Sequence, residues 1–151
     1  MTRRIGVMTS GGDAQGMNAA VRAIVRAGIH AGVEVFAVQE GWQGAIEGGE
    51  QIVQLYWSDV SGILPKGGTM IGTARSPEFR TREGQLTAVE NLIERGIDRL
   101  IVIGGDGSMR GVHDLAGEVT RRGLPISVVG IPKTIDNAIP LTGTRSGSQT
   151  A

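Results

Sequence analysis

The stretch from Leu100 to Gly111, LIVIGGDGSMRG, constrains the fold of this chain more than any other. Four apolar residues, 100–103, predict a strand that is buried on both faces. A glycine-dense turn follows without a spacer, and a helical pattern begins at about Ser108. Glycines let backbone N–H groups approach an anion closely, and a helix N-terminus favours negative charge. The stretch therefore predicts a phosphate-binding turn.

Asp106 lies inside this turn, where its carboxylate would repel a bare phosphate. The residue suits the position if a divalent metal ion lies between carboxylate and phosphate, as Mg²⁺ usually does in phosphoryl transfer. We therefore expect Mg²⁺ at Asp106. The competing interpretation is a tight turn in which Ser108 caps the helix, and the rest of the chain has to decide between the two.

Composition and charge exclude several classes of protein. Lys+Arg and Asp+Glu number 15 each, so the formal net charge is zero, which argues against binding to nucleic acid or to a membrane surface. The chain has no cysteine, which excludes disulfides and thiolate metal sites. Glycine interrupts the N-terminal apolar run too early for a signal peptide, and nothing approaches a membrane span. We expect a cytoplasmic protein, with one domain in these 151 residues.

Glycine is the unusual component, with 25 residues of 151, more than twice the average usage of about 7%. The glycines gather beside strand-like runs, where backbone must meet a ligand or turn sharply. The clusters are at positions 11, 12 and 16, at 67, 68 and 72, and at 104, 105, 107 and 111.

Apolar runs alternate with helical patterns along the chain, which predicts a Rossmann-like three-layer α/β fold with a mostly parallel sheet. Loops at the carboxyl ends of parallel strands share one edge, where ligands bind in such folds. The glycine-rich segment 63–75 is apolar enough to be an ordered ligand-contacting loop. Strands are expected over 5–9, 33–39, 51–55, 100–103 and 126–130, and helices over 17–31, 42–46, 83–95 and 108–122.

Four segments together resemble the phosphofructokinase family, in order and in spacing, over residues 4–137. A lone GGDGS also occurs in NAD kinases and lipid kinases, so the combination carries the specificity. The segments are TSGGDAQGMNAA (9–20), GGTMIGTAR (67–75), IGGDGS (103–108) and GIPKTIDN (130–137). The resemblance implies that residues 1–137 are a nucleotide-binding domain and that 138–151 begin the crossover to a substrate domain.

The resemblance to ATP-dependent members implies a phosphotransferase of glycolysis. Such an enzyme moves the terminal phosphate of ATP to the 1-hydroxyl of fructose 6-phosphate, with Mg²⁺ held by Asp106. Asp136 would be the base that takes the hydroxyl proton. Thr134 and Ile135 would bind the sugar phosphate together with Asp136. The implied nucleotide-binding residues are Gly12, Arg75, Ser76, Gly105, Asp106, Gly107 and Ser108.

Other interpretations of these residue types stay open. Asp136 could cap a turn or a helix, and Arg75 could be a solvated surface arginine. Lys66 and Lys133 are expected to be solvated lysines, with steering of anions as the alternative. Trp42 and Trp57 are expected to be packing residues, with stacking on a base as the alternative. His30 and His113 are expected to lie on helix surfaces and are assigned no role.

Members of the family use either ATP or pyrophosphate as the phosphoryl donor. A glycine at the fourth position of GGDGS leaves room for a nucleotide, whereas Asp there is typical of pyrophosphate users. Gly107 therefore favours ATP. Lys133 favours pyrophosphate, because many ATP-dependent bacterial members carry Gly at that place. We predict ATP, with a pyrophosphate-dependent phosphofructokinase as the alternative.

Bacterial members of the family are often allosteric tetramers with an effector site built from arginines. Arg22 and Arg26 match two of these arginines, whereas Tyr56 and Trp57 occupy the region where a third is expected. The resemblance thus implies a homo-oligomer and a candidate effector site. A solvated basic helix face is the alternative interpretation.

Three departures from the family pattern favour a different function. Ala138 stands where the family usually carries Asp, so a carboxylate near the substrate is missing. The segment 142–151 is more polar than usual, and the chain covers about half of the family pattern. The other half supplies arginines that grip the sugar phosphate. The alternative is a non-catalytic, truncated nucleotide-binding module.

Overall fold

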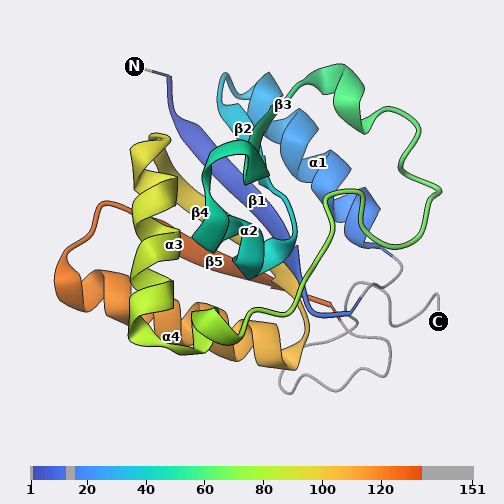
Figure 1. The fold of residues 1–151 in the computed structure, drawn as a ribbon. Helices are drawn as coiled ribbons and strands as arrows, with labels where there is room; N and C mark the ends of the chain where they lie inside the picture. Colours follow the sequence, from blue (N-terminus) through green and yellow to red (C-terminus); the bar gives the residue numbers. More distant parts are fainter. Residues whose placement is uncertain (1, 13–15, 134–151) are drawn as a thin grey trace.

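Among residues 2–12 and 16–133, which the computed structural model describes, a five-stranded sheet carries helices on both faces (Figure 1). The strands are β1 (Arg4–Ser10), β2 (Glu34–Val38), β3 (Ile52–Leu55), β4 (Ile97–Gly104) and β5 (Ser127–Pro132). The α-helices are α1 (Met17–His30), α2 (Gly41–Glu47), α3 (Arg82–Glu94) and α4 (Asp106–Arg122). The 3₁₀ helices are η1 (Gly49–Gln51), η2 (Trp57–Val60) and η3 (Pro77–Arg80).

The strand order is β3-β2-β1-β4-β5, and every pairing is parallel except that of β3 with β2. This confirms the predicted mostly parallel sheet. From β1 the chain passes to β2 and β3 on one side, and β4 and β5 lie on the other. The direction of winding therefore switches between β1 and β4, and ligands of open α/β sheets bind outside the carboxyl ends at such a point.

Side chains that alternate along the strands form a core on each face of the sheet. On one face, Val7 and Val35 pack against α1. On the other face, Met8, Phe36 and Leu100 pack beneath α2, α3 and α4. These five residues are at most 2% exposed. Figure 1 shows α1 on one side of the sheet and α3 and α4 on the other, so the three predicted layers are confirmed.

The predicted helices and strands all occur, with shifted ends. Gly96 follows the predicted helix 83–95 directly, and the structure shows that it closes α3 with a φ of 77°, in the left-handed region that favours glycine. One boundary matters for the site, since α4 begins at Asp106 and not at Ser108. The interpretation of Ser108 as the helix cap is therefore wrong, and Gly105 takes that position with no side-chain cap.

The glycine-rich segment before η3 is ordered by contacts with β1 and α1. The buried amide of Asn18 donates to the carbonyls of Lys66 and Gly67 and accepts from the Met70 N–H. Thr9 at the end of β1 donates to the Gly72 carbonyl at 2.9 Å. The predicted ordered loop is confirmed, and its position is set by residues of the first glycine-rich motif.

Part of the sequence-based prediction lies outside the described residues. It comprises Thr134, Ile135, Asp136, Ala138, the segment 142–151 and the predicted domain boundary after residue 137. Within the described part of the chain, no helix is long and apolar enough to cross a membrane.

Candidate functional site

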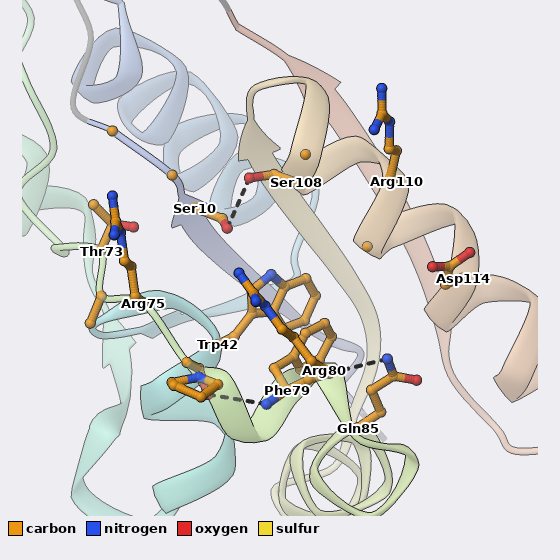
Figure 2. A pocket seen from close by; sticks show the side chains of 17 residues that line it. Ser10, Trp42, Thr73, Arg75, Phe79, Arg80, Gln85, Ser108, Arg110 and Asp114 are labelled. Carbon is orange, nitrogen blue, oxygen red and sulfur yellow. Dashed lines mark hydrogen bonds between the residues drawn. The ribbon is translucent and has the colours of Figure 1, made fainter.

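A cavity of about 930 Å³ opens beside the carboxyl ends of β1 and β4, where the winding of the sheet switches. Its walls come from the residues after β1, from α2, from the segment 73–80 and from the first turns of α4 (Figure 2). The lining residues are Ser10, Gly11, Gly12, Trp42, Thr73, Ala74, Arg75, Ser76, Pro77, Phe79, Arg80, Gln85, Gly107, Ser108, Arg110, Gly111 and Asp114.

The two glycine-rich turns lie together because β1 and β4 end in register. Ser10 is paired with Gly104 across the parallel ladder. The Ser108 hydroxyl then donates to the Ser10 hydroxyl at 3.0 Å, which links the start of α4 to the end of β1. A Cβ on Gly104 would lie 2.4 Å from the Ser108 Cβ and 3.0 Å from the Ser10 carbonyl oxygen. Only glycine allows this close approach.

The first turn of α4 borders the cavity with no side-chain cap. The first N–H groups of an α-helix have no partner within the helix, and Gly107 and Ser108 belong to this turn and line the cavity. A Cβ on Gly107 would meet nothing within 4 Å. This turn therefore combines open space with N–H donors that have no partner within the helix, as binding of an anion requires.

Two arginines add positive charge to the cavity. The side chains of Arg75 and Arg80 have no ion pair or hydrogen bond with any other described residue. Figure 2 shows both side chains on the wall formed by the segment 73–80. Two unneutralised guanidinium groups beside a helix N-terminus favour a ligand with several negative charges.

Lys133 contradicts its sequence-based prediction. We expected a solvated lysine, but the residue is only 7% exposed. Its backbone N–H donates to the Gly104 carbonyl, and its Nζ donates to the Gly12 carbonyl at 2.5 Å. Because β5 ends beside β4, Lys133 lies next to the glycine residues that follow β1, and its side chain contacts them. The lysine therefore supports the wall of the cavity and does not line it.

Asp106 can hold a metal ion only with help from the ligand. Its carboxylate pairs with the Arg110 guanidinium at 2.8 Å, and its side chain is 44% exposed. Residues 2–12 and 16–133 contain no cluster of three or more His, Cys, Asp or Glu side chains suited to a metal. Mg²⁺ usually takes one or two carboxylates, with phosphate oxygens and water completing its shell. Asp106 fits as the single carboxylate of a Mg²⁺–phosphate complex.

An aromatic pair forms the floor of the cavity. Trp42 of α2 stacks on Phe79 of η3, with the ring centroids 3.9 Å apart and an interplanar angle of 12°. Both residues are 7% exposed, which confirms Trp42 as a packing residue. Gln85 donates to the Phe79 carbonyl at 3.1 Å and fixes η3 against α3. The pair thereby holds Arg80, which ends η3, in the wall.

The structure brings most of the expected nucleotide-binding residues to one cavity. Gly12, Arg75, Ser76, Gly107 and Ser108 line it, while Gly105 and Asp106 lie at the start of α4 beside it. Sequence reasoning missed the remaining charged and polar lining residues outside the glycine motifs. They are Arg80, Gln85, Arg110 and Asp114.

Only two of these four residues could have been predicted from the sequence pattern. Arg110 and Asp114 follow Gly107 at helical spacing, so the face of α4 that continues from the turn could have been predicted. Arg80 gave no comparable signal, because a short 3₁₀ helix has no periodic pattern.

Arg26, one of the two candidate effector arginines, is engaged by η2. Its guanidinium lies 4.8 Å from the centroid of the Trp57 ring, and its Nη2 donates to Ser61 at 3.1 Å. Trp57 is half-exposed and covers this arginine, which departs from a simple packing role. Arg22 is half-buried on the same helix. An effector at Arg22 and Arg26 stays a prediction, and Lys66, His30 and His113 are exposed as expected.

Comparison with known proteins gives one consistent result. The family model described as Phosphofructokinase matches residues 4–151. The chain is 48% identical to the ATP-dependent 6-phosphofructokinase subunit alpha of Saccharomyces cerevisiae and covers 17% of it. It is 47% identical to the human platelet-type ATP-dependent 6-phosphofructokinase and covers 21% of it. Both alignments include 99% of this chain, which thus spans about a fifth of these relatives' length.

Solved structures give the same result. A phosphofructokinase structure from Saccharomyces cerevisiae superposes with a TM-score of 0.89 at 47% identity, over 99% of this chain and 22% of that one. The Pichia pastoris phosphofructokinase structure gives 0.92 at 44% identity, over 99% and 18%. A pyrophosphate-dependent phosphofructokinase from Marinobacter aquaeolei has the same fold, with a TM-score of 0.83 at 21% identity, over 97% and 37%. The chain belongs to the phosphofructokinase family.

Proposed function

We propose that this chain is the nucleotide-binding part of an ATP-dependent 6-phosphofructokinase of glycolysis. The observation that carries the proposal is the cavity at the switch between β1 and β4. There, the uncapped first turn of α4 and the unpaired Arg75 and Arg80 meet in one place. Relatives at 47% to 48% identity are named as ATP-dependent enzymes, which supports the choice of reaction.

In this proposal the chain binds the phosphates of ATP and neutralises their charge. Backbone N–H groups at Gly107 and Ser108 donate to phosphate oxygens, and Arg75 and Arg80 balance the remaining charge. Mg²⁺, when bound with the nucleotide and Asp106, supplies further charge neutralisation in the transition state. Because phosphoryl transfer depends on positioning and electrostatics, a rigid anion site of this kind provides much of what the reaction needs.

The acceptor side of the reaction is assigned to the motif that follows β5. Thr134 and Ile135 bind fructose 6-phosphate together with Asp136. The Asp136 carboxylate takes the proton from the 1-hydroxyl as that oxygen attacks the terminal phosphorus, and ADP leaves. This motif lies beyond the described residues. Its support is the end of β5, where Pro132 pairs with Gly104 beside the cavity.

ATP is proposed over pyrophosphate as the donor. The space around Gly107 supports this choice, because a Cβ there would meet nothing within 4 Å. Lys133, which favoured pyrophosphate in the sequence, is buried and bonded to the Gly12 carbonyl. Its identity therefore carries less weight for donor choice than that of Gly107.

The coupled assay with ATP, Mg²⁺ and fructose 6-phosphate tests the function. We propose that residues beyond position 151 in the family pattern anchor the sugar phosphate, so the chain by itself should run near background. A version extended to family length should be active, and its Asp136→Asn variant should lose at least about 10²-fold in kcat. An active Asp136→Asn variant would exclude this residue as the base.

The alternative candidate is a non-catalytic nucleotide-binding module, which the specific observation of Ala138 favours. An extended chain that binds Mg·ATP but transfers no phosphate would establish that alternative.

We further propose that the protein assembles into homo-oligomers, as a tetramer at family length. The yeast relative is named as a subunit, which supports an assembly of some kind, while identical subunits and the number four are implied by the family resemblance alone. Sedimentation of the extended chain would measure the assembly.

A further inference from the structure

The charges around the cavity are not evenly distributed. Arg75, Arg80 and Arg110 line it together with one carboxylate, that of Asp114. Within residues 2–12 and 16–133, the Asp114 side chain has no ion pair or hydrogen bond. Its side chain is exposed and comes from α4, whereas Arg80 comes from the opposite wall at η3 (Figure 2). An unpaired acidic group in an otherwise cationic cavity needs an explanation in terms of the ligand.

The position of Asp114 along α4 separates it from the phosphate end. Gly107, Gly111 and Asp114 follow one another at helical spacing and all line the cavity. At a rise of about 1.5 Å per residue, Asp114 lies roughly 9 Å along the helix from Ser108. A phosphate chain bound at the first turn would therefore stay clear of the carboxylate, and the next part of a nucleotide would reach it.

We propose that Asp114 is a specificity-determining residue that recognises the nucleoside part of the ligand. An ionised carboxylate only accepts hydrogen bonds, so its partner must be a donor. In a nucleotide such as ATP, the donors beyond the phosphates are the ribose hydroxyls and the exocyclic amine of the base. The inference rests on the proposed function. It also gives the orientation of the bound nucleotide, with its phosphates at Gly12 and Ser108 and its nucleoside at Asp114.

Calorimetric titrations with Mg²⁺ compare ATP with inorganic tripolyphosphate, which lacks a nucleoside. In Asp114→Ala, the preference for ATP over tripolyphosphate should fall about five- to tenfold, as expected for the loss of a hydrogen bond to a charged group at an exposed site. Asp114→Asn, which keeps an acceptor oxygen, should recover part of this preference. The matched control is Glu90→Gln on the exposed side of α3, which removes a charge outside the cavity and should leave the preference unchanged.

Two ATP analogues identify which group of the nucleoside donates a hydrogen bond to Asp114. If Asp114 binds a ribose hydroxyl, 2′-deoxy-ATP should bind the parent protein more weakly than ATP, and Asp114→Ala should lower the affinity for 2′-deoxy-ATP only slightly. If Asp114 binds the base amine, inosine triphosphate should show both results instead. Either result supports the inference.

An unchanged preference for ATP in Asp114→Ala would overturn the inference, and so would equal losses for ATP and tripolyphosphate. If tripolyphosphate still bound the parent protein in either case, the proposed phosphate site would remain supported. A parent protein that binds neither probe would contradict the proposed function as well, so the two failures are distinguishable.

Discussion

Neighbouring glycines in the turn after β4 have different physical roles. Gly104 has no room for a side chain, since an added Cβ would lie 2.4 Å from the Ser108 Cβ and 3.0 Å from the Ser10 carbonyl oxygen. At Gly105, the nearest atom to such a Cβ would be 3.6 Å away, and at Gly107 nothing lies within 4 Å. Gly104 therefore allows the close packing of two strand ends, while Gly107 leaves space for a ligand.

Gly104→Ala should destabilise the protein by about 1–3 kcal/mol, the usual range for overpacking a tight site. The free energy of unfolding from urea denaturation measures this loss. Gly105→Ala is the matched control, because its Cβ would make only ordinary van der Waals contact. Equal stability of the two variants would mean that β1 and α4 do not pack as closely as described.

Gly107→Asp should fold normally and bind ATP at least about fivefold more weakly. The new carboxylate has room, but it would stand beside the phosphates, and like charges about 4 Å apart repel by ~1 kcal/mol even in water. Calorimetric titration with Mg·ATP measures the affinity. Gly117→Asp on the same helix is the control, since it adds the same charge where a Cβ also has space, outside this cavity. Unchanged affinity in Gly107→Asp would remove Gly107 from donor selection.

Asp106→Ala should weaken Mg·ATP binding by about tenfold or more and should make the remaining binding nearly independent of Mg²⁺. The stability change should be small, because an exposed i,i+4 ion pair contributes only about 0.3–0.5 kcal/mol. Arg110→Ala separates the two effects, since it breaks the same ion pair and keeps the carboxylate. If Asp106→Ala retained the parent's Mg²⁺ dependence, Asp106 would not be the metal ligand.

At the scale of elements, the site depends on how α1 holds the loop that leads to Arg75. Asn18 is 4% exposed, and its side-chain amide bonds to three backbone groups between residues 66 and 70. The loop has no regular structure of its own, so these contacts and the bond from Thr9 to Gly72 fix its course. The first glycine-rich motif thus positions residues far along the chain as well as binding ligand itself.

Asn18→Ala should lower the free energy of unfolding by about 1–3 kcal/mol, because the loop loses three hydrogen bonds to a buried side chain. It should also weaken Mg·ATP binding several-fold, since the loop carries Arg75 into the cavity. Asn91→Ala is a matched control, because the Asn91 amide bonds in a similar way to the carbonyls of Ala45 and Ile46, away from the cavity. Calorimetric titration should show reduced affinity in Asn18→Ala and parent-like affinity in Asn91→Ala. Equal affinities would show that the loop does not position the arginine.

The sequence predicted the regular elements because their signals are local. Apolar runs such as 100–103 and the closing glycine at position 96 act through short-range geometry. Features that depend on tertiary contacts were not predictable in this way. The burial of Lys133 follows from the place of β5 beside β4, and the position of Arg80 follows from the stacking of Phe79 on Trp42. The order of the strands, which sets the location of the cavity, also cannot be predicted from the residues of any single segment.

At the scale of the whole molecule, the sheet brings together segments that are distant in sequence. Ser10, Arg75 and Ser108 line one cavity because β1 and β4 end side by side and the loop before η3 folds over them. The chain spans about a fifth of the relatives' length, so the acceptor side of the reaction is a separate question from the nucleotide site. Our main proposal for the nucleotide site is that this cavity binds the phosphates of ATP.

A backbone-amide NMR titration of the isotope-labelled chain with Mg·ATP shows which residues the nucleotide contacts. Saturable shifts should be largest at Gly12, Gly107 and Ser108, with little change at the opposite ends of β1 and β4, near Arg4 and Ile97. Tripolyphosphate should reproduce the shifts at the three cavity residues. An absence of saturable shifts, or shifts that gather away from the carboxyl ends of β1 and β4, would show that this cavity does not bind the phosphates of ATP.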